Sequence, residues 1–182
     1  MKTRSSSRKC MHGAAAVELA LMLIVLVPLA LGVAEFGHAI SQYETLTKGT
    51  RDAARYLSTY LPSDPAYPLA QAQCLAVYGS ATCPTGNATP LVTGLTTSMV
   101  VVCDAVNTTN CQDTTDPTLF ASVPTYDSNN GAAGGTQSGS INVVEVKIKG
   151  FKYQPIEPFF NPTLNLAQLI FNDIFTVMRQ VS

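Results

Sequence analysis

Histidine is scarce in this chain, whose 182 residues include only His12 and His38. Both histidines flank a long apolar segment, so a Ser/His/Asp or Cys/His group would have to recruit His38 from beside a membrane. The sequence also lacks a nucleophile elbow, a P-loop, a G-x-G-x-x-G turn and any cluster with metal-ligand spacing. These absences argue against an enzyme, and against a bound cofactor or metal.

Basic residues are few and unevenly placed. Four of the eleven lie before Gly13, in a stretch without acidic residues: Lys2, Arg4, Arg8 and Lys9. After Gly13, seven basic and twelve acidic residues give a net charge of −5, with no basic patch dense enough to bind nucleic acid. Residues 1–13 therefore form a basic leader. This leader predicts a cytoplasmic amino terminus, because positive flanks of a membrane segment stay on the cytoplasmic side.

Charge is nearly absent from residues 14–34, where Glu18 is the single charged side chain among 21 residues. Such a helix would extend about 31 Å, enough to cross the core of a lipid bilayer. We therefore expect a transmembrane helix over residues 14–36, kinked or loosened by one turn at Pro28. An ionisable group in a membrane segment is costly, so Glu18 either meets a partner or lies unpaired at the headgroup level.

A cleaved secretory signal is an alternative interpretation of the same segment. Small residues at Gly32 and Ala34 would suit a signal peptidase, which would release the rest of the chain. The apolar run is, however, longer than the roughly 7–15 residues usual in a signal peptide. A retained span is therefore the favoured interpretation.

Residues 37–61 are expected to extend the helix beyond the membrane, with apolar side chains largely at three- and four-residue steps and Pro62 at the end. Arg51 and Arg55 form a like-charge pair on this segment. They belong either to a solvated helix face or to a contact surface for partners. The helical glycines Gly32, Gly37 and Gly49 are the expected weak points.

Residues 62–182 are expected to form an extracytoplasmic domain of the α+β class. The periodicity predicts a helix over 68–78 and strands over 99–103 and 141–151, the last alternating Val144, Val146 and Ile148 with charged residues. A stretch rich in Thr, Asp, Ser, Asn and Gly predicts a flexible loop over 113–140. Residues 164–181 fit a helix or a strand. Four aspartates in loop-like sequence are expected to be solvated: Asp104, Asp113, Asp116 and Asp127.

Five cysteines divide between the two sides of the predicted membrane. Cys10 lies in the leader, and the even set of four lies on the far side, where disulfides can form: Cys74, Cys83, Cys103 and Cys111. Pairing of near neighbours, Cys74 with Cys83 and Cys103 with Cys111, is preferred among the three possible connectivities. Zinc is the less favoured alternative, because the spacings are not of the C-x2-C type.

With these residues in view, the chain resembles the TadE-like family of minor pseudopilins of Tad (Flp-type) pilus systems. The resemblance is close over residues 13–57 and looser beyond them. It rests on three sequence blocks at fitting distances, GAAAVELAL from Gly13, GVAEFG from Gly32 and RDAARY from Arg51.

The resemblance implies a pilin-like architecture, with a long amino-terminal transmembrane and amphipathic helix followed by a small disulfide-stapled domain containing a short antiparallel sheet. It also implies that a prepilin peptidase cuts the chain between Gly13 and Ala14. Glu18 would then be an assembly or recognition residue that meets the new amino terminus of a neighbouring subunit. The implied partners are other Tad pseudopilins or pilins and inner-membrane assembly proteins.

The sequence therefore predicts a structural or assembly protein with one pass through the bacterial inner membrane. Its amino terminus would be cytoplasmic and its domain periplasmic, with or without incorporation into the pilus. The alternative is an extracytoplasmic binding module held by an ordinary signal anchor, which would keep residues 1–13.

Overall fold

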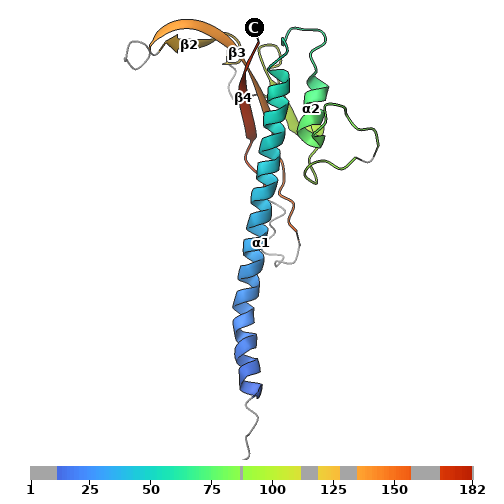
Figure 1. Ribbon diagram of the computed structural model, residues 1–182, viewed down its shortest axis with the longest axis vertical. Coiled ribbons are helices and arrows are strands. Elements are labelled where there is room, and N and C mark those ends of the chain that lie inside the picture. Colours follow the sequence, from blue (N-terminus) through green and yellow to red (C-terminus); the bar gives the residue numbers. More distant parts are fainter. Residues whose placement is uncertain (1–11, 87, 112–118, 128–134, 157–168, 182) are drawn as a thin grey trace, which may run out of the picture. The chain divides into compact units, whose positions relative to one another are not determined.

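The computed structural model describes residues 12–86, 88–111, 119–127, 135–156 and 169–181 (Figure 1). Two units can be distinguished, Met1–His38 and Ala39–Ser182. The first contains the beginning of helix α1 (His12–Leu57), and the second contains the rest of α1 together with the α+β domain.

Helix α1 ends at Leu57, four residues before the predicted end at residue 61. The hydroxyls of Ser58 and Thr59 donate to the carbonyls of Arg55 and Tyr56, at 2.8 and 2.9 Å, and thereby satisfy acceptors of the last turn. Such side-chain bonds compete with continuation of a helix. The prediction was too long because Pro62 was treated as the stop signal.

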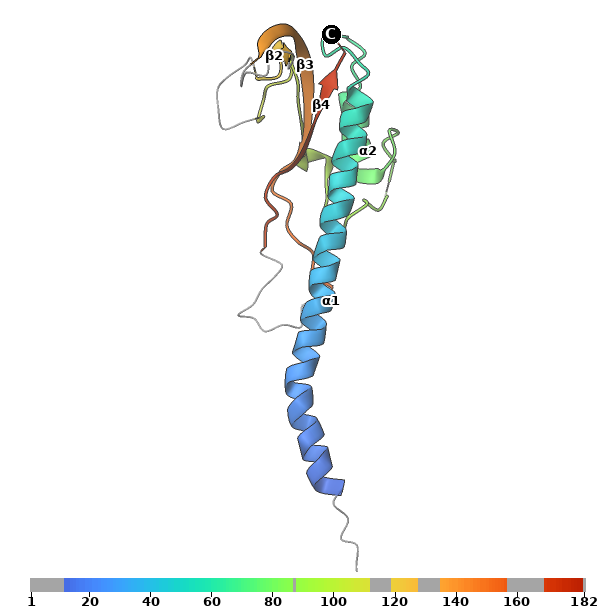
Figure 2. The same cartoon turned by 60° about the vertical axis from the view of Figure 1, so that its left-hand side comes forward.

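Antiparallel strands form the sheet of the second unit (Figure 2). Its members are β1 (Val100–Cys103), β2 (Val123–Asp127), β3 (Thr136–Ile148) and β4 (Ile174–Gln180). The long strand β3 is central, because its second half pairs with β1 and with β4, and its first half pairs with β2. The short helices α2 (Leu69–Tyr78) and η1 (Thr97–Met99) precede β1.

The hydrophobic core lies between one face of the sheet and the two helices. The buried residues of α1 that face this core are spaced three or four positions apart, as in an amphipathic helix; they are Leu46, Gly49, Thr50, Ala53, Ala54 and Leu57. They pack with Ala72, Ala76 and Val77 of α2 and with alternate residues of the sheet, including Val100, Val144, Val146, Ile148 and Ile174. The predicted α+β class is confirmed.

Two of the local predictions need correction or completion. The flexible loop predicted over residues 113–140 is wrong where the structure describes it, because β2 and the first residues of β3 lie inside that range and pair with each other. Residues 112–118 and 128–134 are outside the described part of the chain. The undecided segment 164–181 contains a strand, β4, and its residues 164–168 are also outside the described part.

Candidate membrane anchor and assembly surface

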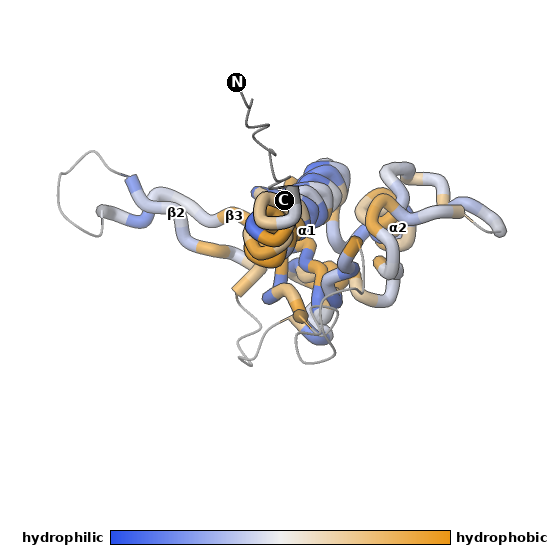
Figure 3. The backbone as a smooth tube through the Cα atoms, turned by 90° about the horizontal axis from the view of Figure 1, so that it is seen from below, coloured by the Kyte–Doolittle hydropathy of each residue, from blue (hydrophilic) through white to orange (hydrophobic). Residues whose placement is uncertain are grey.

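The first part of α1 presents an exposed apolar surface. Every residue from Gly13 to Ala34 is exposed, including Val17 at 62%, Ile24 at 68% and Val33 at 66%. Most of this part of the helix is coloured as hydrophobic in Figure 3. Among the described residues it belongs to the one helix that is long and apolar enough to cross a membrane. It therefore fits a single-pass membrane anchor.

Ala14 and Glu18 lie on one face of this helix, because they are four residues apart within α1. The rise between them is about 6 Å along the axis. The immediate neighbours of Glu18, Val17 and Leu19, are 62% and 60% exposed. The carboxylate is thus one helical turn from the residue that would become the amino terminus after cleavage at Gly13. Cleavage and the role of Glu18 stay predictions.

Pro28 lies inside α1, which continues through it. Because proline has no backbone N–H, the carbonyl of Ile24 lacks its usual donor at this turn. A bend of the helix at Pro28 stays a prediction.

Arg51 and Arg55 are both exposed, on a face of α1 beside the buried Thr50, Ala54 and Leu57. Within the described residues, neither arginine forms an ion pair. A partner surface at these arginines therefore stays a prediction.

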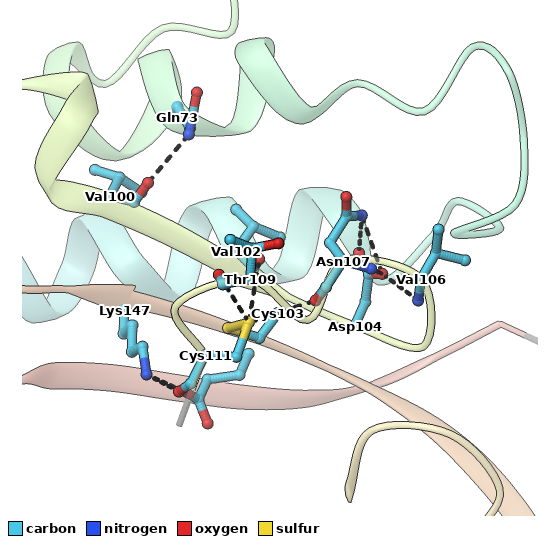
Figure 4. Close-up of a disulfide and its surroundings, with 11 residues drawn as sticks. Gln73, Val100, Val102, Cys103, Asp104, Val106, Asn107, Thr109, Cys111 and Lys147 are labelled. Carbon is cyan, nitrogen blue, oxygen red and sulfur yellow. Dashed lines mark hydrogen bonds and ion pairs between the residues drawn. A yellow bond between two sulfur atoms is a disulfide. The ribbon is translucent and has the colours of Figure 1, made fainter. Parts of the chain in front are cut away.

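Asp104 follows β1 and is completely buried, which overturns the expectation that it is solvated (Figure 4). Its Oδ1 accepts hydrogen bonds from the backbone N–H groups of Val106 and Asn107, at 2.9 and 2.7 Å. The side-chain amide of Asn107 donates to both carboxylate oxygens, at 3.0 and 2.9 Å. These donors replace the water molecules that the carboxylate loses on burial. Asp104 thereby stabilises the turn that follows β1.

Removing this carboxylate should destabilise the domain. In Asp104→Ala, the N–H groups of Val106 and Asn107 lose their acceptor, and we expect the free energy of unfolding to fall by about 2 kcal/mol. Chemical denaturation of the full chain in detergent measures the change. Asp52→Ala, at an exposed position of α1, is the matched control and should change stability by less than about 0.5 kcal/mol. Equal stability of the two variants would contradict this role of Asp104.

A second buried polar group joins the ends of several elements. The Gln180 Nε2 donates to the hydroxyl oxygen of Tyr67 at 3.0 Å and to the Leu57 carbonyl at 3.4 Å. Burial and the negative charge of Asp104 raise the pKa of Tyr67 well above its ordinary value, and the bond from Gln180 opposes this shift. Gln180 therefore connects β4 with the end of α1, and the neutral Tyr67 hydroxyl connects Gln180 with Asp104.

The opposite face of the sheet carries a buried pair of charges. The Lys147 Nζ lies 3.7 Å from the Glu145 Oε1 and donates a hydrogen bond to the Cys111 carbonyl. Burial raises the pKa of the Glu145 carboxyl, Lys147 lowers it in part, and Asp173 raises it further. Lys147 thus holds the loop containing Cys111 against β3.

The cysteine pairs agree with the preferred connectivity. The sulfur atoms of Cys74 and Cys83, and those of Cys103 and Cys111, lie at disulfide distance, with Cα atoms 5.2 and 5.5 Å apart. Cys74 is on α2, and Cys103 is the last residue of β1. Each pair closes a short loop onto a regular element of the domain.

The polar side chains discussed above stabilise turns and strands of the domain. No group of three or more His, Cys, Asp or Glu residues in this part of the chain is placed to hold a metal ion. The buried Asp104 and Glu145 and the half-buried Tyr67 contact backbone or side-chain groups that fix turns and strands. Sequence reasoning missed Asp104, although an aspartate followed by Asn107 at the end of a strand is a recognisable turn signal.

Comparison with known proteins agrees with the resemblance of the amino-terminal segment. The model of the family described as TadE-like protein matches residues 13–55. No curated protein and no solved structure matches the chain. The match is confined to helix α1, and the matched family is a structural, pilus-related one that is not known as enzymatic.

Proposed function

We propose that this protein is a minor pseudopilin-like subunit that acts in the assembly of a Tad (Flp-type) pilus or a related secretion machine. The observation that carries the proposal is the position of the family match, which begins at Gly13 and ends within α1. The matched segment thus starts at the glycine of the proposed cleavage site and covers the exposed apolar helix.

In this proposal a prepilin peptidase removes residues 1–13 on the cytoplasmic side of the inner membrane. Residues 14–36 then anchor the chain, and the domain beyond residue 61 lies in the periplasm. Cleavage removes four basic side chains and leaves a free amino group on Ala14. The Glu18 carboxylate of a neighbouring subunit would pair with this group, which offsets part of the cost of burying each charge.

The amino terminus and intact mass of the protein, purified from membranes with and without the prepilin peptidase, test this proposal. We expect a chain that begins at Ala14 in the strain with the peptidase and at Met1 in the strain without it. A chain that keeps residues 1–13 in both strains would support the signal-anchored binding module. A chain that begins beyond Gly32 would indicate a secreted domain.

A further inference from the structure

Strand β4 pairs with another strand on one side. It pairs with β3 from Ile148 opposite Ile174 to Asn142 opposite Gln180, and this register has no interruption. Within the described residues, no strand pairs with its other side. β4 is therefore an edge strand of seven residues.

The hydrogen bonds of β3 identify the backbone groups of β4 that face the open edge. The N–H of Lys149 donates to the Met99 carbonyl at 2.9 Å, and that of Val143 donates to the Phe120 carbonyl at 3.0 Å. Both groups therefore point to the side of β1. Because N–H groups alternate sides along a strand, the groups that point to β4 are those of Val144, Val146 and Ile148.

The residues of β4 that pair with these three are Met178, Thr176 and Ile174, and their backbone N–H and C=O groups bond to β3. The N–H and C=O groups of Phe175, Val177 and Arg179 consequently face outward. Val181 continues this alternation, and its outward N–H donates to the Ser58 carbonyl at 3.1 Å. Within the described residues, no backbone hydrogen bond outside the ladder reaches the three outward residues of β4.

The outer edges of β1 and β2 are protected. At β1, the side chain of Gln73 on α2 donates to the outward carbonyl of Val100 at 3.1 Å (Figure 4). At β2, Pro124 has no N–H, and the register shifts between Thr125 and Tyr126. Proline, bulges and covering elements are the usual means of preventing strand addition at an edge. β4 contains no proline and no bulge.

The outer face of β4 indicates what such an edge would bind. Phe175 and Val177 are 61% and 46% exposed, and the exposed Arg179 forms no ion pair with a described residue. An added strand places alternate side chains beside this face. The complementary segment therefore has apolar residues at alternate positions and a carboxylate beside Arg179.

Antiparallel pairing with the β4 strand of a second copy does not fit the edge. β4 runs in the same direction as the adjacent part of α1, because Thr50 contacts Thr176 at 3.0 Å and Ser58 contacts Val181 at 3.1 Å (Figure 2). Antiparallel pairing of two β4 strands would place the two copies of Ala39 at opposite ends of the dimer. This step rests on the proposed function, in which residues 14–36 of both copies enter one membrane.

We propose that the open edge of β4 accepts an extended segment of a partner protein as an additional antiparallel strand. This segment alternates apolar residues and carries a carboxylate beside Arg179. Main-chain hydrogen bonds to Phe175, Val177 and Arg179 supply affinity, and the alternate side chains supply specificity.

A synthetic peptide is the probe for this edge. The full chain in detergent micelles is mixed with a nine-residue peptide of alternating valine and threonine that contains one glutamate. We expect at least tenfold slower hydrogen exchange at the amides of Phe175, Val177 and Arg179. The amides of Thr176 and Met178, already bonded to β3, should not change. The same peptide methylated on every backbone nitrogen should give no protection, because it has lost the donors of both edges.

Two variants separate strand addition from nonspecific binding. Val177→Pro removes an N–H that makes no internal bond, so peptide binding should be lost while the domain stays folded. Arg179→Glu should weaken binding of the glutamate peptide at least fivefold and favour a lysine peptide.

The proposal is overturned if the peptides give no protection. Protection that appears without peptide as the chain concentration and the dimer mass rise would assign the edge to a second copy instead. The peptide result does not depend on cleavage after Gly13, so failure at this edge and failure of the proposed function are distinguishable.

Discussion

Replacing Glu18 with glutamine should reduce the number of pili per cell at least tenfold while cleavage after Gly13 continues. In the proposed assembly, the Glu18 carboxylate is the partner of an Ala14 ammonium group in apolar surroundings. Loss of one member of a buried charge pair costs about 2–5 kcal/mol, because the other charge is left unpaired, and each 1.4 kcal/mol corresponds to about tenfold in affinity. Electron microscopy of cells gives the number of pili, and the intact mass of the chain gives the extent of cleavage.

Two further variants define the role of Glu18. Glu44→Gln removes an exposed carboxylate elsewhere in α1 and should leave the number of pili unchanged. Glu18→Asp keeps the charge on a shorter side chain and should restore part of the assembly. Normal piliation in Glu18→Gln would contradict the charge pair. An uncleaved Glu18→Gln chain would instead assign the residue to recognition by the peptidase.

The elements that the sequence predicts correctly are those determined by local patterns. The long helix follows from one uninterrupted apolar run and a heptad-like continuation, and the structure places it over His12–Leu57. The strand around Val144 follows from alternation of apolar and charged residues, which is visible without any knowledge of its partners. The cysteine pairs are separated by nine and eight residues, so each closes a local loop.

The features that the sequence does not predict depend on pairing and contacts that no local residue pattern shows. Residues 123–127 and 136–140 look like a polar loop, and they become strands because each supplies the hydrogen-bonding partner of the other. The sequence of residues 164–181 fits a helix or a strand, and pairing with β3 makes the part that forms β4 a strand. Asp104 is buried and contacts both Tyr67 and the turn at Asn107.

Gly49 illustrates the same limit at a single position, and it gives the second prediction with a large effect. The sequence marks it as a weak point of the helix, whereas the structure buries it against α2. A Cβ atom at Gly49 would lie 2.6 Å from the carbonyl oxygen of Ala76, and this neighbour is backbone. The glycine is therefore the point of close approach between α1 and α2.

Gly49→Ala should lower the free energy of unfolding, although alanine favours a helix by about 1 kcal/mol over glycine. Overpacking costs about 1–3 kcal/mol, and here neither helix backbone can move without opening the core around Leu46 and Val77. Gly49→Leu should cost about 3 kcal/mol or more, the upper end of that range. Chemical denaturation in detergent measures both changes.

Gly37→Ala is the matched control, because a Cβ atom at Gly37 has no neighbour within 4 Å. It adds the same methyl group to the same helix and should keep or raise helix stability. A Gly49→Ala variant as stable as Gly37→Ala would mean that α1 and α2 separate without cost. A loss confined to Gly49 would instead identify the contact at Ala76 as the constraint that fixes the domain on α1.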